Sequence, residues 1–292
     1  MAYIGQRLHL WLISIYIRNA LIAIFTTFFL FFSSDLSATS RDEALAYHPK
    51  GKLFSYCFKS RILKNKRDIW VYVPASYRCE ETPYPLLIVF DGQAYTSQLI
   101  PGPTILDHLI AEGQIPPLVA VFISSIDQRR RNQELPCYAP FIDSLMQELL
   151  PWLHRHYFIT FNPSQIIVAG SSYGGLAAAY AALRYPQRFG NVLSQSGAFW
   201  WQLAQNDGPW LIRQFETQPL LPLRFYLDVG NQETEYWEGK MSMLGINRDL
   251  RDLLRRKGYS VAYYEFQGGH DYECWRKTFA IGLVALIKKK ER

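Results

Sequence analysis

Apolar runs of strand length alternate with amphipathic runs of helical length along most of this chain. Residues 84–91 (YPLLIVFD) form a continuous apolar run bounded by Pro and Gly, which is typical of a buried strand, whereas residues 140–156 carry apolar side chains at helical spacing. The predicted strands are residues 53–63, 68–73, 84–91, 118–124, 166–169, 191–196, 224–229 and 260–266. The predicted helices are residues 103–113, 140–156, 176–184, 241–257 and 274–289.

This alternation predicts an α/β fold in which a mostly parallel central sheet of about eight strands has helices on both faces. The first two strands flank the polar segment Lys64-Asn65-Lys66-Arg67, so we expect them to form a hairpin that adds an antiparallel edge. The chain has 292 residues, which is long enough for one large domain of this kind.

A hydrophobic segment precedes this pattern. Residues 8–32 are nearly all apolar, and residues 20–32 have the length of a signal-peptide core. Leu36-Ser37-Ala38 resembles a cleavage site, but residues 8–32 are also long enough to remain as a membrane anchor. Because both interpretations export the domain, we expect a signal peptide or anchor over residues 1–38, a linker over residues 39–52 and the folded domain over residues 53–292.

The composition narrows the range of possible functions. The net charge of +6 is scattered without a dense basic stripe, which argues against nucleic acid binding. The 8 Trp and 19 Tyr favour an aromatic binding surface. Cys57 and Cys79 lie near the two ends of the predicted hairpin and could pair in an exported protein. No Cys or His pair has zinc-ligand spacing, so we expect no metal and no organic cofactor.

Residues 170–174 (GSSYG) carry the pattern Gly-x-Ser-x-Gly between a predicted strand and a helix-forming run. In that context the central serine sits in strained backbone, with its hydroxyl exposed at the end of a central strand. Gly170 and Gly174 lack Cβ atoms, which allows the strand and the helix to approach each other closely. Ser172 is therefore the candidate nucleophile, and Ser171 is a turn residue.

A serine nucleophile needs a base and an acid that orients the base. His270 is the only histidine after Ser172 and lies just past the last predicted strand, so it is the candidate base. The acid should follow the strand at residues 224–229, where Asp228 lies within the strand and Glu233 lies in the loop at its end. Active-site groups collect in such loops, so Glu233 is the preferred acid and Asp228 the alternative.

An oxyanion hole needs two backbone N–H groups. The first is expected from Tyr173, the residue after the nucleophile. The second is expected from the loop after the strand at residues 84–91, where Gly92 permits close approach and the amide of Gln93 or Gly92 can face the substrate carbonyl.

With these residues placed, the chain resembles the esterase family of α/β-hydrolases, and within it the enterochelin (enterobactin) esterases. The resemblance runs from about residue 68 to residue 286. It rests on residues 87–93 (LIVFDGQ), 131–137 (RNQELPC), 147–151 (QELLP), 168–176 (VAGSSYGGL), 185–190 (YPQRFG), 193–197 (LSQSG) with Trp200-Trp201, and 268–271 (GGHD) with 274–276 (CWR).

The resemblance implies the α/β-hydrolase fold and hydrolysis of the trilactone backbone of ferric catecholate siderophores, so iron would arrive with the substrate. It matches Ser172 and His270 to the nucleophile and base, and it places Arg131 and Glu134 in a motif that borders the substrate cleft. Some relatives rely on a Ser-His pair with a weak third member, which leaves the role of Glu233 open. Single-domain members with an amino-terminal anchor work in the periplasm, and the chain has that layout.

Two further features suit a bulky aromatic anion. The guanidinium of Arg131 has the geometry to bind catecholate oxygens or a carboxylate. Trp200 and Trp201 can stack on the aromatic rings of a ligand, although one of the pair is expected to pack against a helix.

The sequence therefore predicts a periplasmic serine esterase that cleaves a catecholate siderophore such as enterobactin, with a small-molecule ester as its partner. Two alternatives stay open. One is a carboxylesterase, thioesterase or acyltransferase that acts on another acyl substrate. The other is an exported protein of this fold that binds a siderophore without cleaving it.

Overall fold

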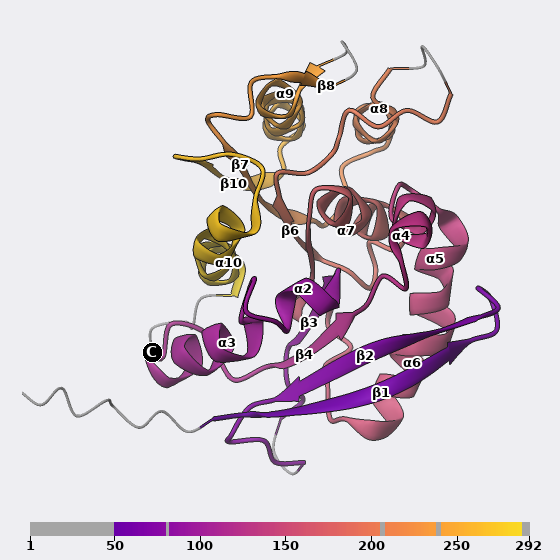
Figure 1. Ribbon diagram of the computed structural model, residues 1–292, viewed down its shortest axis with the longest axis vertical. Coiled ribbons are helices and arrows are strands. Elements are labelled where there is room, and N and C mark those ends of the chain that lie inside the picture. Colours follow the sequence, from indigo (N-terminus) through magenta and orange to yellow (C-terminus); the bar gives the residue numbers. More distant parts are fainter. Residues whose placement is uncertain (1–49, 80–81, 205–207, 238–240, 288–292) are drawn as a thin grey trace, which may run out of the picture. The chain divides into compact units, whose positions relative to one another are not determined.

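The computed structural model describes residues 50–79, 82–204, 208–237 and 241–287, which belong to one compact unit. Its centre is an eight-stranded sheet with the order β1-β2-β4-β3-β5-β6-β7-β10 (Figure 1). These strands are β1 (Lys52–Ser60), β2 (Asn65–Val73), β3 (Leu86–Phe90), β4 (Val119–Ile123), β5 (Ile166–Ser171), β6 (Asn191–Gln195), β7 (Arg224–Gly230) and β10 (Ser260–Phe266). The strands from β4 to β10 are parallel, and β1 and β2 add an antiparallel edge. The expected sheet and its opening hairpin are thus confirmed.

Helices cover both faces of the sheet, so the central strands are buried on both sides. The first face is covered by α5 (Ala139–Ser144), α6 (Leu150–His156), α7 (Tyr173–Arg184), α8 (Trp210–Thr217) and α9 (Met243–Arg256). The opposite face is covered by α3 (Gly102–Ala111) and α10 (Tyr272–Ile287) (Figure 1). Every residue of β3, β4 and β5 is buried, which explains their continuous apolar sequences.

The helix expected over residues 140–156 is interrupted by a π-helical turn. Leu145–Leu149 joins α5 to α6, and the amide of Leu150 bonds to the carbonyl of Leu145, five residues back. Pro151 follows in the first turn of α6 and has no N–H to donate. The wider turn therefore lets the helical path continue past the proline.

Several short elements have no counterpart in the sequence pattern. They are α2 (Gly92–Tyr95), α4 (Gln128–Glu134), α8 and the small hairpin of β8 (Tyr236–Trp237) and β9 (Met241–Ser242). The sequence of α4, QRRRNQE, has no apolar period, and the helix instead begins where the Asp127 side chain accepts a hydrogen bond from the Arg130 amide at 2.7 Å. These elements matter because α2 and α4 lie beside the candidate site.

Two expectations about the chain have different outcomes. The signal peptide or anchor and nearly all of the linker lie outside the described residues, whose helices include none that is long and apolar enough to cross a membrane. The suggested disulfide is wrong, because Cys57 and Cys79 are both free and exposed. Cys57 lies within the hairpin opposite Asp68, whereas Cys79 follows β2, with its Sγ 3.8 Å from the hydroxyl of Tyr77.

Candidate active site

Ser172 occupies a sharp turn between β5 and α7. Its backbone angles are φ 56° and ψ −118°, which is the strained geometry expected for a serine in this turn. The neighbouring loop holds this conformation, because the Ser172 amide donates to the carbonyl of Gln195 at 2.8 Å and the Ser172 carbonyl accepts from the amide of Ala198 at 3.1 Å. The residue is only half buried, so the turn presents its side chain at the carboxyl edge of the sheet.

Close packing at this turn depends on Gly170 more than on Gly174. A Cβ atom at Gly170 would lie 2.6 Å from the backbone carbon of Gly174, which no relaxed structure accommodates. A Cβ atom at Gly174 would make ordinary contacts, the nearest at 3.5 Å from Asp91. The expectation that both glycines are needed for close approach therefore holds for Gly170 alone.

His270 and Glu233 meet at the same edge of the sheet. Nδ1 of His270, in the loop after β10, lies 2.6 Å from Oε2 of Glu233, in the loop after β7. The Glu233 side chain is only 2% exposed, and its other oxygen accepts from the Gly230 amide at 2.8 Å and from the Ser196 hydroxyl at 2.6 Å. Both oxygens of the carboxylate are therefore hydrogen-bonded, and the carboxylate holds the Nδ1 edge of the imidazole.

Two residues that sequence reasoning missed complete this arrangement. The indole of Trp275 stands edge-on to the His270 ring with centroids 4.8 Å apart, and its Nε1 donates to the Ser196 hydroxyl at 3.0 Å. Ser196 has a positive φ of 45° and follows β6 in the segment LSQSG. The signal that could have identified it is the Ser-x-Ser-Gly segment directly after a predicted central strand.

Asp228, the alternative acid, lies elsewhere. It is fully buried within β7, on the face covered by α10, and its burial raises the pKa of the carboxyl from 3.8 to about 7, with nearby hydroxyls of Thr278 and Tyr226 opposing the rise. No histidine contacts it within the described chain. The geometry therefore pairs His270 with Glu233 and not with Asp228.

The described residues contain no direct hydrogen bond between the Ser172 hydroxyl and His270. The connection between them runs through the loop after β6. Ser172 bonds through its backbone to Gln195 and Ala198, and Ser196 between them donates to Glu233, which binds His270. The nucleophile turn, the acid loop and the histidine loop are thus held in one hydrogen-bonded unit.

The amides proposed for an oxyanion hole begin two neighbouring helices. Gly92 and Gln93 start α2 after β3, and Tyr173 starts α7 after the adjacent parallel strand β5. Amides in the first turn of a helix have no acceptor within the helix, and such amides commonly bind anionic groups. The side chain of Gln93 is fixed away from this point, since its Oε1 accepts from the Ser125 amide at 3.0 Å.

Arg131 binds the loop that carries these amides. Its Nε and Nη2 donate to the two oxygens of Asp91 at 2.9 and 2.8 Å, and Asp91 is the residue before Gly92, with a positive φ of 54°. The guanidinium also lies over the ring of Tyr173, 5.8 Å from its centroid. The guanidinium of Arg131 therefore binds the carboxylate of Asp91 and stabilises the starts of α2 and α7. The Arg131 side chain is only 16% exposed.

The placement of Glu134 is a correction. Its side chain is 3% exposed and forms an ion pair with Arg67 at 2.9 Å, and Asn65 donates to its other oxygen at 3.1 Å. Arg67 and Asn65 belong to β2, so Glu134 joins α4 to the sheet and does not line a cleft.

The two tryptophans make different contacts. The Trp200 ring lies 5.9 Å from that of Tyr173, beside the elbow. The Trp201 ring instead packs edge-on against Trp210 of α8 at 6.2 Å. Trp200 is thus the tryptophan next to the candidate site.

Among the described residues, no cluster of three or more His, Cys, Asp or Glu side chains is arranged to hold a metal.

Several known proteins are similar to this chain in sequence. The iron(III) enterobactin esterase of Dickeya dadantii (strain 3937) is 36% identical over 247 residues, covering 79% of this chain and 54% of that protein. The iron(III) enterobactin esterase of Escherichia coli (strain K12) is 35% identical over 233 residues, covering 78% of this chain and 56% of that protein. The chain therefore spans about half the length of these curated relatives.

Among solved structures, the enterobactin esterase FES from Shigella flexneri in the presence of enterobactin aligns with a TM-score of 0.73 and 33% identity, covering 82% of this chain and 60% of that one. The same enzyme in the presence of 2,3-dihydroxy-N-benzoyl-serine aligns with a TM-score of 0.72 and 32% identity over the same shares. A family model with the description "Putative esterase" matches residues 60–286. This chain has the α/β-hydrolase fold and belongs to that esterase family.

Proposed function

We propose that this protein is a serine esterase that hydrolyses the ester bonds of a catecholate siderophore in iron acquisition. The observation that carries the proposal is the contact between His270 and Glu233, joined through Ser196 to the strained turn of Ser172. A nucleophile, a base and an acid at the carboxyl edge of one sheet are the groups that acyl transfer requires.

The order of proton transfers follows from which imidazole nitrogen is engaged. Because Nδ1 of His270 faces Glu233, Nε2 is the atom that takes the Ser172 proton as Oγ attacks the ester carbonyl. The amides of Tyr173 and of Gln93 or Gly92 stabilise the oxyanion. His270 then protonates the leaving alcohol, and a water that it deprotonates releases the acid from Ser172.

The substrate class rests on the relatives and on the side chains beside the elbow. Relatives of this chain include iron(III) enterobactin esterases, and structures of FES were determined in the presence of enterobactin and of 2,3-dihydroxy-N-benzoyl-serine. Here, Tyr173 and Trp200 offer aromatic surface next to Ser172, with the Arg131 cation against the Tyr173 ring. This surface suits the catechol rings of such a substrate.

The decisive experiment compares the full chain with its Ser172→Ala and Ser171→Ala variants on apo and ferric enterobactin, with products identified by mass spectrometry. We expect linear and monomeric dihydroxybenzoyl-serine products from the wild type and from Ser171→Ala, and none from Ser172→Ala. If the protein hydrolyses short p-nitrophenyl esters or thioesters faster than any siderophore, its substrate is another acyl compound and not a siderophore. If the wild type binds the siderophore without hydrolysing it, the proposal that this protein is an esterase is wrong.

The apolar segment at residues 8–32 supports export to the periplasm, as a cleaved signal or an inner-membrane anchor. Cell fractionation of the full chain, with the mass of the mature protein, tests this location. A chain of full mass in the cytoplasm would contradict it.

A further inference from the structure

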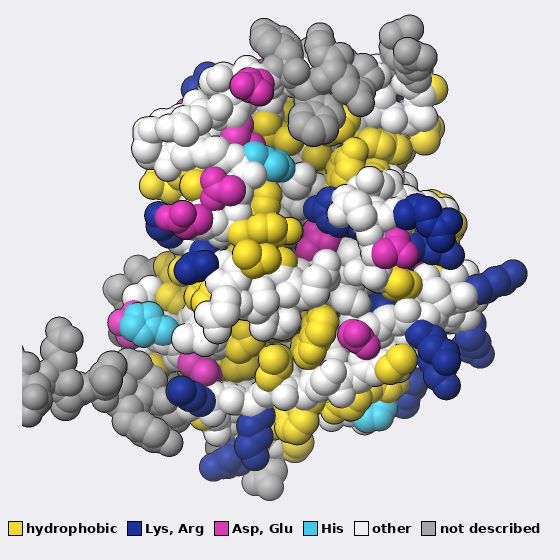
Figure 2. Space-filling model, in the orientation of Figure 1, with side chains coloured by type: hydrophobic (Ala, Val, Ile, Leu, Met, Phe, Trp, Pro, Cys, Tyr) yellow, Lys and Arg dark blue, Asp and Glu magenta, His cyan; other side chains and the backbone are white. Residues whose placement is uncertain are grey.

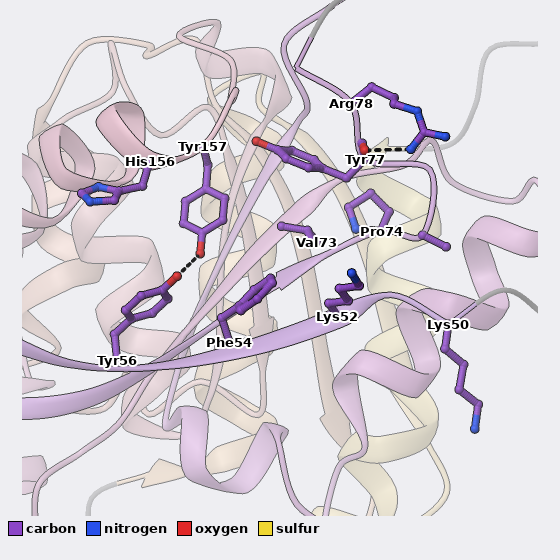
Figure 3. Close-up of a pocket in the computed structure, with 11 residues that line it drawn as sticks. Lys50, Lys52, Phe54, Tyr56, Val73, Pro74, Tyr77, Arg78, His156 and Tyr157 are labelled. Atoms are coloured by element: carbon purple, nitrogen blue, oxygen red, sulfur yellow. Dashed lines mark hydrogen bonds between the residues drawn. The ribbon is translucent and has the colours of Figure 1, made fainter.

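An open pocket of about 450 Å³ lies under the antiparallel hairpin, and nothing in the proposed mechanism uses it. Its walls come from β1, from the segment that follows β2 and from the end of α6 (Figure 3). The lining residues are Lys50, Lys52, Phe54, Tyr56, Val73, Pro74, Ala75, Tyr77, Arg78, His156 and Tyr157. Its volume lies in the range of about 300–1,000 Å³ that small-molecule sites occupy.

The pocket and Ser172 lie at opposite ends of the sheet's strands. β2 runs antiparallel to β4, with Ile69 opposite Ile123 and Tyr72 opposite Ala120. The end of β2 at Val73 therefore lies at the amino ends of the parallel strands, whereas Ser172 follows the carboxyl end of β5. A ligand in this pocket would not reach the catalytic residues.

Aromatic rings form the side walls, and hydrogen bonds fix them in place. The hydroxyls of Tyr56 and Tyr157 lie 2.7 Å apart, as the dashed line in Figure 3 shows. The hydroxyl of Tyr77 accepts from the amide of Phe158 at 2.7 Å, and the Tyr56 ring stands edge-on to Trp152 at 4.9 Å. The rings are thus positioned before any ligand arrives, and Phe54 adds a ring that is 41% exposed.

The charge of the lining is positive. Lys50, Lys52 and Arg78 are exposed cations, and the lining contains no Asp or Glu among the residues that the structure describes. Asp107, which lies close to the start of β1, already accepts from the Gly51 amide and the Tyr72 hydroxyl, both at 2.7 Å. Figure 3 shows Lys52 rising from β1 between Phe54 and Pro74, while Lys50 points away. Figure 2 shows further Lys and Arg side chains over the hairpin.

We infer that this pocket binds a small aromatic anion, such as a benzoate or a catecholate. Its ring lies between Phe54 and the tyrosines, and its anionic oxygens face Lys52. Aromatic walls favour a ring over a bare phosphate, because stacking on several faces needs a planar apolar body. Lys52 of β1 supplies charge recognition, and no carboxylate among the described lining residues competes for it. The inference does not depend on the proposed esterase activity.

The test measures binding of 2,3-dihydroxybenzoate to the full chain by titration calorimetry, in the Ser172→Ala background so that nothing is hydrolysed. Cyclohexanecarboxylate and inorganic phosphate serve as anions without an aromatic ring. We expect saturable binding with a Kd of about 1 mM or tighter. Both comparison anions should bind at least about tenfold more weakly.

Variants locate the site. Lys52→Glu and Phe54→Ala should each weaken binding at least about tenfold, and both residues are exposed enough for the fold to tolerate the change. Lys59→Glu, on the same strand but outside the pocket, should bind like the parent. Absence of saturable binding, or Lys52→Glu binding as tightly as the parent, would overturn the inference. In the active chain, Lys52→Glu should hydrolyse p-nitrophenyl esters at the wild-type rate. A failure of the binding inference can therefore be distinguished from a failure of the proposed esterase function.

Discussion

The imidazole of His270 and the carboxylate of Glu233 meet at 2.6 Å between two loops that are 37 residues apart in the sequence. The carboxylate is almost completely buried, and the imidazole is about one-third exposed. A buried acid behind an accessible imidazole fixes which nitrogen carries the proton, and it stabilises the imidazolium that forms during acyl transfer.

Glu233→Gln should lower kcat on an ester substrate by about 10³-fold or more, because the amide cannot stabilise the imidazolium or hold the required tautomer. Asp228→Asn is the matched control and should keep most of the activity, since Asp228 contacts no histidine in the described chain. Steady-state kinetics with circular dichroism of both folded variants checks this. A larger loss in Asp228→Asn than in Glu233→Gln would reverse the assignment.

Stability should depend on pH through Asp228. Burial raises the pKa of its carboxyl from 3.8 to about 7, so between these values the folded protein keeps a proton that the unfolded chain has lost. The stability from this group is therefore greatest below about pH 4, falls as the pH rises to about 7, and is constant above that.

Asp228→Asn removes this titration. The free energy of unfolding of the variant, relative to wild type, should therefore rise by about 2 kcal/mol between about pH 5 and pH 8. Urea unfolding of both proteins at the two pH values measures the difference. A constant difference would mean that Asp228 is ionised in the folded protein across this range.

Arg131→Ala should lower kcat by about 10- to 100-fold, because Asp91 then loses the partner that holds the Gly92 and Gln93 amides in place. Arg129→Ala, an exposed neighbour on the same helix, should leave kcat unchanged. The split between kcat and KM decides the role of Arg131. A higher KM with unchanged kcat would indicate that Arg131 contacts the substrate directly.

Gly170→Ala should destabilise the domain by about 1–3 kcal/mol and lower activity, because the new methyl group meets the backbone of Gly174. Gly174→Ala adds the same methyl group where only ordinary contacts await it, so its effect on stability should be small. Thermal unfolding of the pair measures the contrast. Equal destabilisation would show that the close approach at Gly170 is not the tightest point of the turn.

The central strands could be predicted from the sequence because β3, β4 and β5 are short apolar runs buried on both faces. The four-residue helix α2 and the polar helix α4 could not, since neither has an apolar period. The start of α4 depends on the Asp127 cap, whereas α2 has no side-chain cap at its start. These helices place Arg131 and the Gly92 and Gln93 amides proposed for the oxyanion hole, so the pattern missed part of the site's framework.

Sequence order located the candidate nucleophile and base but left the acid open. Whether a carboxylate within a strand or just after it reaches the histidine depends on the direction of each side chain, and a one-residue difference reverses that direction. Glu134 was misplaced for a related reason. Its partner Arg67 lies 67 residues earlier in the chain, on a strand whose inward side had to be known first.

The hairpin has a consequence for solubility. Among the described strands, β1 is an edge strand that pairs only with β2, so the alternate N–H and C=O groups along its nine residues that point away from β2 are unpaired. Such a row can recruit a strand from another copy. Lys52 and Lys59, near its two ends, repel an incoming identical strand. A neutral substitution at Lys52 would therefore favour self-association.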